Sequence, residues 1–206
     1  MVSGKGKRLP RVELPVVSCA HDVDDLRSAL GLLAGVPGEL LRTCEPVDPA
    51  LELAGAYKAI GAGVPLPPPA PAGPAVLFEN VLGYTMPVVT GVLASRRRAA
   101  LLIGSAPDRL PFDLLEALER GRPPMEVPRG EAFCQQAVVR PPFDLRALIP
   151  APSHTRLDAG PYFNMGLLRA EDPDTGEANV SIHRLCVQAP GQLTIYFLPG
   201  RRADHR

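Results

Sequence analysis

The sequence predicts an α+β protein in which a small N-terminal α/β unit precedes a strand-rich region. Helical and strand-like patterns intermix up to about residue 122, and short strand-like runs separated by turns follow. The 25 prolines and 19 glycines disfavour long uninterrupted helices. Apolar residues make up 46% and charged residues 21% of the 206 residues, which is typical of a globular chain and excludes wholesale disorder.

The N-terminal unit, residues 21–122, is expected to contain three helices. Residues 22–34 carry leucines at i, i+4 and i+7, and Asp22 is the expected cap. Further helices are predicted over residues 50–60 and 112–120. Strands or other apolar runs occupy the stretches between them: residues 39–44, 75–82, 88–94 and 99–103.

Three other segments of this half have a predicted character. Residues 1–20 are expected to be a flexible tail, and the proline-rich residues 61–74 a loop or spacer. The arginine run at residues 96–98 suggests either a phosphate site or a solvated turn, and the pattern favours the solvated turn.

The second region, residues 123–206, is predicted to form an antiparallel sheet or barrel. Asp172-Pro-Asp-Thr-Gly176 is expected to be a hairpin turn joining two strands. The strand-like runs lie on either side of such turns: residues 136–139, 162–168, 179–187 and 192–198.

Charge and composition exclude several classes of protein. Lys plus Arg and Asp plus Glu both number 22, so the chain has no basic excess for coating nucleic acid or a membrane surface. No apolar run approaches the roughly 18 residues of a membrane span, and no secretory signal is recognisable. The four cysteines form no CxxC motif, so we expect reduced, buried cysteines in a cytoplasmic protein.

One segment concentrates polar chemistry: Asn179-Val-Ser-Ile-His-Arg184. Strand alternation places Asn179, Ser181 and His183 on one face and Arg184 on the other. A phosphate ester and a hard cation would satisfy such groups, because Arg binds phosphate oxygens and a carboxamide oxygen suits magnesium or manganese. An edge strand with one solvated face is the alternative.

This segment and several others, in collinear order, resemble the UbiD-type decarboxylases. The specific matches lie in the second region: Asp158-Ala-Gly-Pro-Tyr162, Gly166-Leu-Leu, Asp172-Pro-Asp-Thr-Gly176 and Asn179-Val-Ser-Ile-His-Arg184. The weaker matches lie in the first: Asp25-Leu-Arg27, Gly38-Glu-Leu-Leu-Arg42, Glu45-Pro-Val-Asp-Pro49, Leu77-Phe-Glu-Asn80, Gly83-Tyr84 and Ser95-Arg-Arg-Arg98. The resemblance extends over residues 22–200.

The resemblance implies a carboxy-lyase that decarboxylates aromatic or α,β-unsaturated carboxylic acids without oxidation and often reversibly. It implies prenylated FMN as cofactor, with a divalent metal (Mn²⁺ or Mg²⁺) and K⁺. It also implies that residues 123–206 form an incomplete split β-barrel of the flavin-reductase type. Chemistry of this kind belongs largely to the cofactor, while the protein supplies position and proton transfer.

Residue roles follow from matching positions in the family motif. Asn179 matches a metal ligand, and Arg184 matches the catalytic arginine that holds the substrate carboxylate beside the flavin. Asn164 falls where the family has a flavin-contacting threonine. The remaining matches are positions that line the flavin: Ser181, Ile182 and His183. Because Asn179 and Arg184 differ in strand parity, we expect either a strand that begins only near Ser181 or a cofactor that straddles its end.

Two features depart from the family pattern. The metal-ligand histidine is expected near residues 198–202, where this chain has Arg201 and Arg202, with His205 beyond. Family members are also much longer, and their remaining metal ligand, catalytic glutamates and oligomerisation domain have no counterpart here. The expected partners are therefore a carboxylic acid, a subunit carrying the C-terminal part, a flavin prenyltransferase that supplies the cofactor, and other subunits of an oligomer.

Two other interpretations stay open. The chain could be a non-catalytic module that binds FMN on a split barrel, or a structural subunit of a decarboxylase complex. Retention of Asn179, Ser181 and Arg184 favours the catalytic interpretation, whereas the missing histidine favours the other two.

Overall fold

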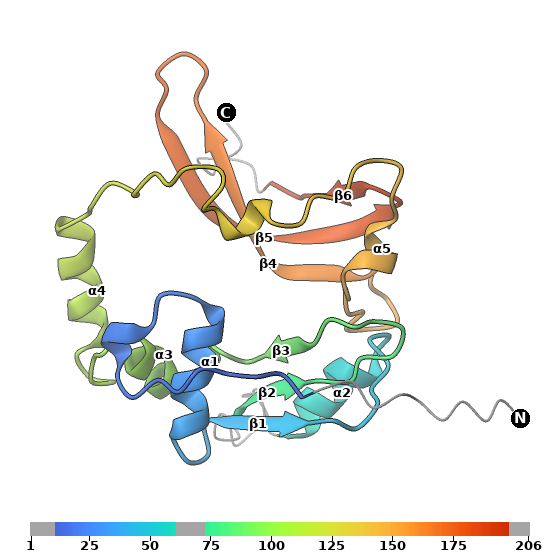
Figure 1. Ribbon diagram of the computed structural model, residues 1–206, viewed down its shortest axis with the longest axis horizontal. Coiled ribbons are helices and arrows are strands. Elements are labelled where there is room, and N and C mark those ends of the chain that lie inside the picture. Colours follow the sequence, from blue (N-terminus) through green and yellow to red (C-terminus); the bar gives the residue numbers. More distant parts are fainter. Residues whose placement is uncertain (1–10, 61–72, 198–206) are drawn as a thin grey trace, which may run out of the picture.

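A computed structural model describes residues 11–60 and 73–197 (Figure 1). They form two three-stranded sheets, with strand orders β1-β2-β3 and β4-β5-β6. Helices gather around the first sheet, whereas the second lies above it in Figure 1 with one short helix beside it. The α+β class is thus confirmed in its coarse form. Within the described residues neither sheet closes into a barrel, so the split barrel stays a prediction.

The first sheet is covered on both faces. Its central strand β2 (Ala75–Phe78) runs parallel to β1 (Leu40–Thr43) and antiparallel to β3 (Val88–Thr90), and all four β2 residues are buried. Ala75 packs into one apolar cluster while Val76 and Phe78 pack into another, because alternate side chains of a strand face opposite ways. The N-terminal unit therefore has a core on each side of β2.

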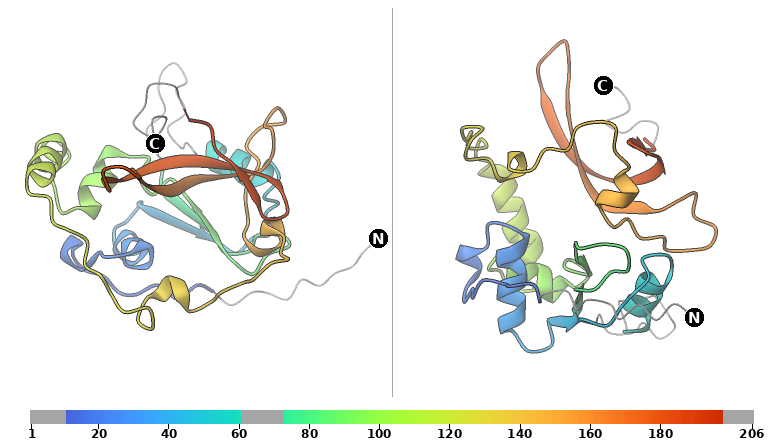
Figure 2. Two further views of the ribbon diagram at one scale, coloured as in Figure 1. Left: turned by 90° about the horizontal axis from the view of Figure 1, so that it is seen from above. Right: turned by 45° about the vertical axis from the view of Figure 1, so that its right-hand side comes forward.

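Helices supply the other half of each core. On one face, α1 (Leu26–Gly35) and α3 (Arg96–Leu102) contribute buried leucines, and on the other α2 (Glu52–Ala59) contributes Leu53. The fourth helix, α4 (Leu110–Glu119), has no buried residue and projects to one side, as the left view of Figure 2 shows. The sequence thus located α1, α2 and α4, whereas α3 lies where it suggested an arginine turn followed by the apolar run 99–103, so that prediction was wrong.

The cap of α1 differs from the prediction. Asp25, not Asp22, begins the helix: its carboxylate accepts a hydrogen bond from the Ser28 backbone amide at 2.7 Å, and Ser28 Oγ accepts one from the Asp25 amide at 3.0 Å. This reciprocal pair is a capping box. Asp22 instead ends a 3₁₀ turn, Ala20–Asp22, which the leucine spacing does not reveal.

The arginine run is not a solvated turn. Arg96–Arg98 open α3, and Arg98 is only 1% exposed. Its Nε lies 3.1 Å from Glu39 Oε2, and its guanidinium also donates to the carbonyl oxygens of Gly73 and Gly91. The prediction of a solvated turn was wrong because a buried acid 59 residues away neutralises this arginine.

The second sheet is an antiparallel meander. It contains β4 (Tyr162–Glu171), β5 (Ala178–Ala189) and β6 (Gln192–Thr194). The predicted hairpin turn is confirmed: Gly176 N donates to Asp172 O at 2.8 Å, and Gly176 has φ +71°. The predicted strand at residues 136–139 is wrong. That stretch is irregular, and Pro141 and Pro142, which follow it, cannot donate ladder hydrogen bonds.

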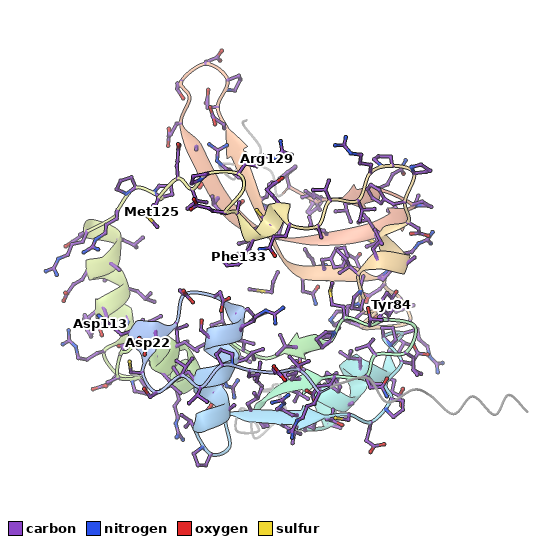
Figure 3. All side chains as sticks on the ribbon, in the orientation of Figure 1. Asp22, Tyr84, Asp113, Met125, Arg129 and Phe133 are labelled. Atoms are coloured by element: carbon purple, nitrogen blue, oxygen red, sulfur yellow. The ribbon has the colours of Figure 1, made fainter. Side chains whose placement is uncertain are left out.

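Short contacts join the two halves. Leu51 N donates to Ser153 O and Ser153 N donates to Pro49 O, both at 3.1 Å. The Tyr84 hydroxyl donates to the Arg146 carbonyl in α5 (Leu145–Leu148), and Figure 3 shows Tyr84 at this junction. These contacts hold the start of the second region against α2 and the loop before β3.

The predicted tail and spacer lie only partly within the described residues. Residues 1–10 of the predicted tail and most of the predicted spacer lie outside the described residues. Val12 N donates to Glu79 Oε1 at 2.9 Å, so the later part of the predicted tail contacts the first sheet. The four cysteines all lie in the described residues and form no disulfide, but only Cys186 is buried, so the expectation that all are buried was wrong. Among the described helices, none has the length and apolar character needed to cross a membrane.

Candidate functional site

Strand β5 carries the polar motif and separates it onto two faces. Asn179, Ser181 and His183 are half-buried, whereas Val180 and Ile182 between them are exposed. The strand is continuous from Ala178, which pairs with Glu171 across the hairpin. The expectation that the strand begins near Ser181 was therefore wrong, and alternation directs Asn179 and Arg184 to opposite faces.

Arg184 lies at a cavity on the face of this sheet opposite to Ser181 and His183. Its guanidinium carbon is 3.9 Å from the centroid of the Tyr162 ring, a cation–π arrangement. The cavity, here called the Arg184 cavity, has a volume of about 420 Å³. It is lined by polar and aromatic side chains together with Ala159: Tyr162, Arg184, Cys186, Gln188, Thr194 and Tyr196.

Arg184 is the one charged side chain among the described residues that line this cavity. Arg184 forms no salt bridge with any acidic side chain in residues 11–60 or 73–197, and no Asp or Glu is among the described residues that line the cavity. Gln188 Nε2 lies 3.0 Å from Cys186 Sγ, which holds the amide beside the arginine. An unpaired guanidinium at an aromatic wall can bind a carboxylate or a phosphate through its forked donors.

The opposite face holds two of the predicted flavin residues. Ser181 Oγ and His183 Nε2 are 2.9 Å apart, and the His183 ring meets Phe197 edge to face with centroids 5.3 Å apart. Ile182 is 57% exposed and projects with Leu167 from the other face. The structure therefore joins Ser181 and His183 to each other but not to Arg184.

The predicted metal ligand has no described companions. Asn179 is half-buried near the hairpin end of β5. No group of three His, Cys, Asp or Glu side chains that could hold a metal ion occurs within the described part of the chain. Arg201, Arg202 and His205 lie outside that part. The metal role of Asn179 stays a prediction.

Asn164 lies at a different cavity. Its amide nitrogen is 2.8 Å from His154 Nε2, and both residues line a space of about 570 Å³ between β3 and the start of β4, here called the inter-sheet cavity. Tyr162 contributes to the walls of both cavities. The structure thus brings Asn164 to His154 rather than to Arg184.

Sequence reasoning missed most of the Arg184 cavity. Cys186 and Gln188 follow Arg184 at i+2 and i+4, so strand alternation could have placed them on its face. Tyr162 requires knowledge of register, because it reaches that face by pairing with Cys186. The sequence pattern offered no signal for Tyr196, which follows β6.

Most of the chain resembles one family of known proteins. The N-terminal domain of 3-octaprenyl-4-hydroxybenzoate carboxy-lyase matches residues 36–118, and the Rift-related domain of the same carboxy-lyase matches residues 125–206. Gallate decarboxylase from Lactiplantibacillus plantarum is 36% identical over 182 residues, which cover 86% of this chain and 37% of that protein.

Solved structures give the same result. Apo 3,4-dihydroxybenzoic acid decarboxylase from Klebsiella pneumoniae is 42% identical with a TM-score of 0.82, covering 88% of this chain and 38% of that one. An evolved dimeric form of the UbiD-class enzyme HmfF from Pelotomaculum thermopropionicum, in complex with prenylated FMN, is 37% identical with a TM-score of 0.77, covering 87% and 39%. The chain thus spans about two fifths of the length of these relatives.

Proposed function

Because the chain belongs to the UbiD family of carboxy-lyases, we propose that it takes part in the non-oxidative, reversible decarboxylation of an aromatic or α,β-unsaturated carboxylic acid. Two relatives are named for decarboxylation of gallate and of 3,4-dihydroxybenzoate, which are aromatic acids. The protein is proposed to supply the part of the site that binds and orients the carboxylate.

Arg184 is the observation that supports this role. It is a cation without an acidic partner in the described residues, at a cavity walled by Tyr162 and Tyr196. Such a wall offers aromatic surface to a ring, while the guanidinium offers two parallel donors to a carboxylate. The cavity volume of about 420 Å³ lies within the range of small-molecule sites.

Decarboxylation needs a proton as well as a cation. Loss of CO₂ from a carboxylate leaves an electron pair on carbon, and a general acid must protonate that carbon. No Asp or Glu is among the described residues that line the Arg184 cavity. In this proposal Arg184 binds and orients the carboxylate, and the proton donor comes from the rest of a UbiD-type assembly.

The face of β5 that carries Ser181 and His183 has groups that suit a flavin. Ser181 and His183 present a hydroxyl and an imidazole on a half-buried face, and these are groups that hydrogen-bond phosphate or a flavin edge. Ile182, which projects from the other face of β5, and Asn164, which contacts His154, are the remaining proposed flavin-lining residues. Asn179 would offer its carboxamide oxygen to Mn²⁺ or Mg²⁺, with K⁺ nearby. When bound, prenylated FMN supplies an electrophile that accepts the electron pair of the departing carboxylate.

Exposed apolar residues support the proposed partners. Leu167 and Val180 are 72% and 60% exposed on the hairpin of the second sheet. A patch of this kind marks an interaction surface, and the chain spans only about two fifths of its relatives. We propose that the C-terminal part of the fold covers it within a cytoplasmic oligomer, and that a flavin prenyltransferase supplies the cofactor.

The opposed faces of β5 favour a second candidate function. Since Asn179 and Arg184 point away from each other, the strand can bind flavin on one face without forming a complete catalytic site on the other. The alternative is therefore a non-catalytic FMN-binding or structural subunit of a decarboxylase complex. Flavin absorbance of protein co-expressed with a flavin prenyltransferase, purified with and without a complementing C-terminal chain, distinguishes these functions.

Carboxylate binding tests the main proposal. Titration of the purified chain with 3,4-dihydroxybenzoate, followed by NMR shifts of β5 amides, is expected to give saturable binding that Arg184→Gln weakens roughly 10- to 100-fold, since hydrogen bonds to charged groups contribute about 1.5–3 kcal/mol. Arg169→Gln is the matched control, because Arg169 lies in β4 but pairs with Glu171. Equal loss in both variants, or none in Arg184→Gln, contradicts the proposal.

A further inference from the structure

The Arg184 cavity has two tyrosines in its lining, Tyr162 and Tyr196, and they differ in what they contact. The cation–π contact that the structure describes for Arg184 is with Tyr162, whose ring centroid lies 3.9 Å from the guanidinium carbon. At that distance the guanidinium lies over the ring face, because the ring hydrogens would block an approach in the plane of the ring. One face of Tyr162 is therefore already occupied by Arg184.

The backbone around Tyr162 fixes this ring beside the arginine. Tyr162 N donates to Pro152 O at 3.0 Å, and Tyr162 pairs with Cys186, which shares a face of β5 with Arg184. The chain just before the tyrosine lies close to the same strand, since a Cβ added at Gly160 would lie 3.2 Å from Cys186 Sγ. Tyr162 is thus held from both its own strand and the loop that precedes it.

The pairing of β4 and β5 directs Arg184 towards this ring. The register shifts between Phe163 and Gly166, so that residues 164–165 of β4 together oppose Arg184. A shift of this kind re-aims side chains and leaves one residue without a regular partner across the ladder. Arg184 instead packs on Tyr162, its diagonal neighbour, which a long side chain can reach.

Stacking on Tyr162 leaves the hydrogen-bond donors of Arg184 free. The N–H groups of a guanidinium lie around its edge, whereas the ring contacts its face. Arg184 forms no salt bridge with an acidic side chain within the described residues, so these donors remain for an anion. An arginine already held on a ring loses less rotamer freedom on binding. Tyr162 can therefore raise carboxylate affinity without contacting the carboxylate.

Tyr196 has an open ring at the same cavity. It follows β6, its side chain is 74% exposed, and among the described residues its ring stacks on no other aromatic ring and on no arginine. An exposed aromatic face is stabilised when another ring covers it. Of the two tyrosines, Tyr196 is therefore the one whose ring is available to the ring of a ligand held by Arg184.

We propose that Tyr162 is a positioning residue that holds Arg184 ready for a carboxylate, and that Tyr196 contacts the ring of an aromatic acid and so selects aromatic over aliphatic carboxylates. The inference rests on the proposed function, because it takes Arg184 as the carboxylate-binding group. It goes further by assigning the charge and the ring of the ligand to different tyrosines.

Benzoate and acetate separate the two roles, because both carry a carboxylate and only benzoate carries a ring. In NMR titrations of the full chain, Tyr162→Leu is expected to weaken both ligands by the same factor, about two- to fivefold, as for loss of an exposed cation–π contact. Tyr162→Phe keeps the ring and should bind both ligands like the wild type. Tyr196→Leu is expected to weaken benzoate about two- to tenfold and to leave acetate unchanged.

The free wild-type protein gives a test that needs no ligand and no substitution. Because the guanidinium of Arg184 lies over an aromatic ring, its Nε–H proton is expected to resonate upfield of those of other exposed arginines. Tyr162→Phe should keep this shift and Tyr162→Leu should lose it. In the Arg184→Gln background, Tyr162→Leu is expected to cause no further loss of benzoate affinity, because the tyrosine acts only through the arginine.

The outcomes distinguish this inference from the proposed function. If Arg184→Gln binds both carboxylates like the wild type, both are overturned. If Arg184→Gln weakens binding, the proposed function stands, and the role of Tyr162 is overturned when Tyr162→Leu binds normally or loses benzoate alone, when Tyr162→Phe is equally weak, or when the wild type lacks the upfield shift. The role of Tyr196 is overturned when Tyr196→Leu binds benzoate normally or loses acetate to the same extent.

Discussion

The two sheets differ in how much of themselves they bury. Every residue of β2 is at most 3% exposed, and apolar clusters cover both faces of this strand. In the second sheet only Cys186 and Val187 of β5 are buried, while apolar Val180 and Ile182 are more than half exposed. The first unit therefore carries its own core, whereas the second leaves apolar side chains exposed.

This difference suggests that residues of the first sheet stabilise the fold and residues of the second bind ligands. In the first unit the buried guanidinium of Arg98 is paired with the buried carboxylate of Glu39. The polar groups of the second unit, including Arg184, lie at cavities or on half-exposed faces. We therefore expect substitutions in the first sheet to change the free energy of unfolding, and substitutions in the second to change binding.

The largest expected effect is on the buried ion pair. Arg98→Met removes a side chain that is 2% exposed and leaves Glu39, 8% exposed, without its buried partner. Breaking such a pair costs about 3–5 kcal/mol because one charge stays desolvated. Urea denaturation followed by circular dichroism measures this loss.

Arg97→Met is the matched control for this ion pair. Arg97 Nε lies 3.3 Å from the same carboxylate of Glu39, but its side chain is 70% exposed. A surface ion pair contributes about 0–1 kcal/mol, so this variant should be close to wild type. Equal destabilisation by the two substitutions would show that burial does not distinguish these arginines.

A pair of leucines tests the contrast between the two sheets directly. Leu33→Ala removes a side chain with 0% exposure from the cluster that packs on β2, and is expected to cost about 2–5 kcal/mol. Leu167→Ala, at 72% exposure in β4, is expected to change the free energy of unfolding by less than about 0.5 kcal/mol. A large loss in Leu167→Ala would mean that the second sheet is already covered in the isolated chain.

Local pattern predicted much of the fold. The leucine spacing of α1, the turn residues Asp172–Gly176 and the alternation in β5 each depend on neighbouring residues, and each appears in the structure. The parity of Asn179 and Arg184 likewise followed from strand geometry alone. Which residues share a face of β5 could therefore be predicted from the motif at residues 179–184 alone.

Contacts between residues far apart in the sequence could not be predicted in this way. Arg98 seemed solvated because Glu39 is 59 residues away, and Asn164 could not be placed beside His154 without the fold of the intervening loop. Tyr162 reached Arg184 only through the register of β4 and β5. Each of these contacts depends on tertiary placement, which local propensity does not encode.

The smallest expected effect concerns the helix cap, where sequence and structure disagree by one turn. Asp25→Ala removes the carboxylate that accepts from the Ser28 amide, and is expected to lower the melting temperature by about 2–4 °C. Asp22→Ala removes only a contact with the Cys19 thiol and should leave the melting temperature nearly unchanged. Thermal unfolding of both variants measures the difference. If Asp22→Ala were the more damaging, the helix would begin where the leucine pattern placed it, and the capping box would not be the feature that starts α1.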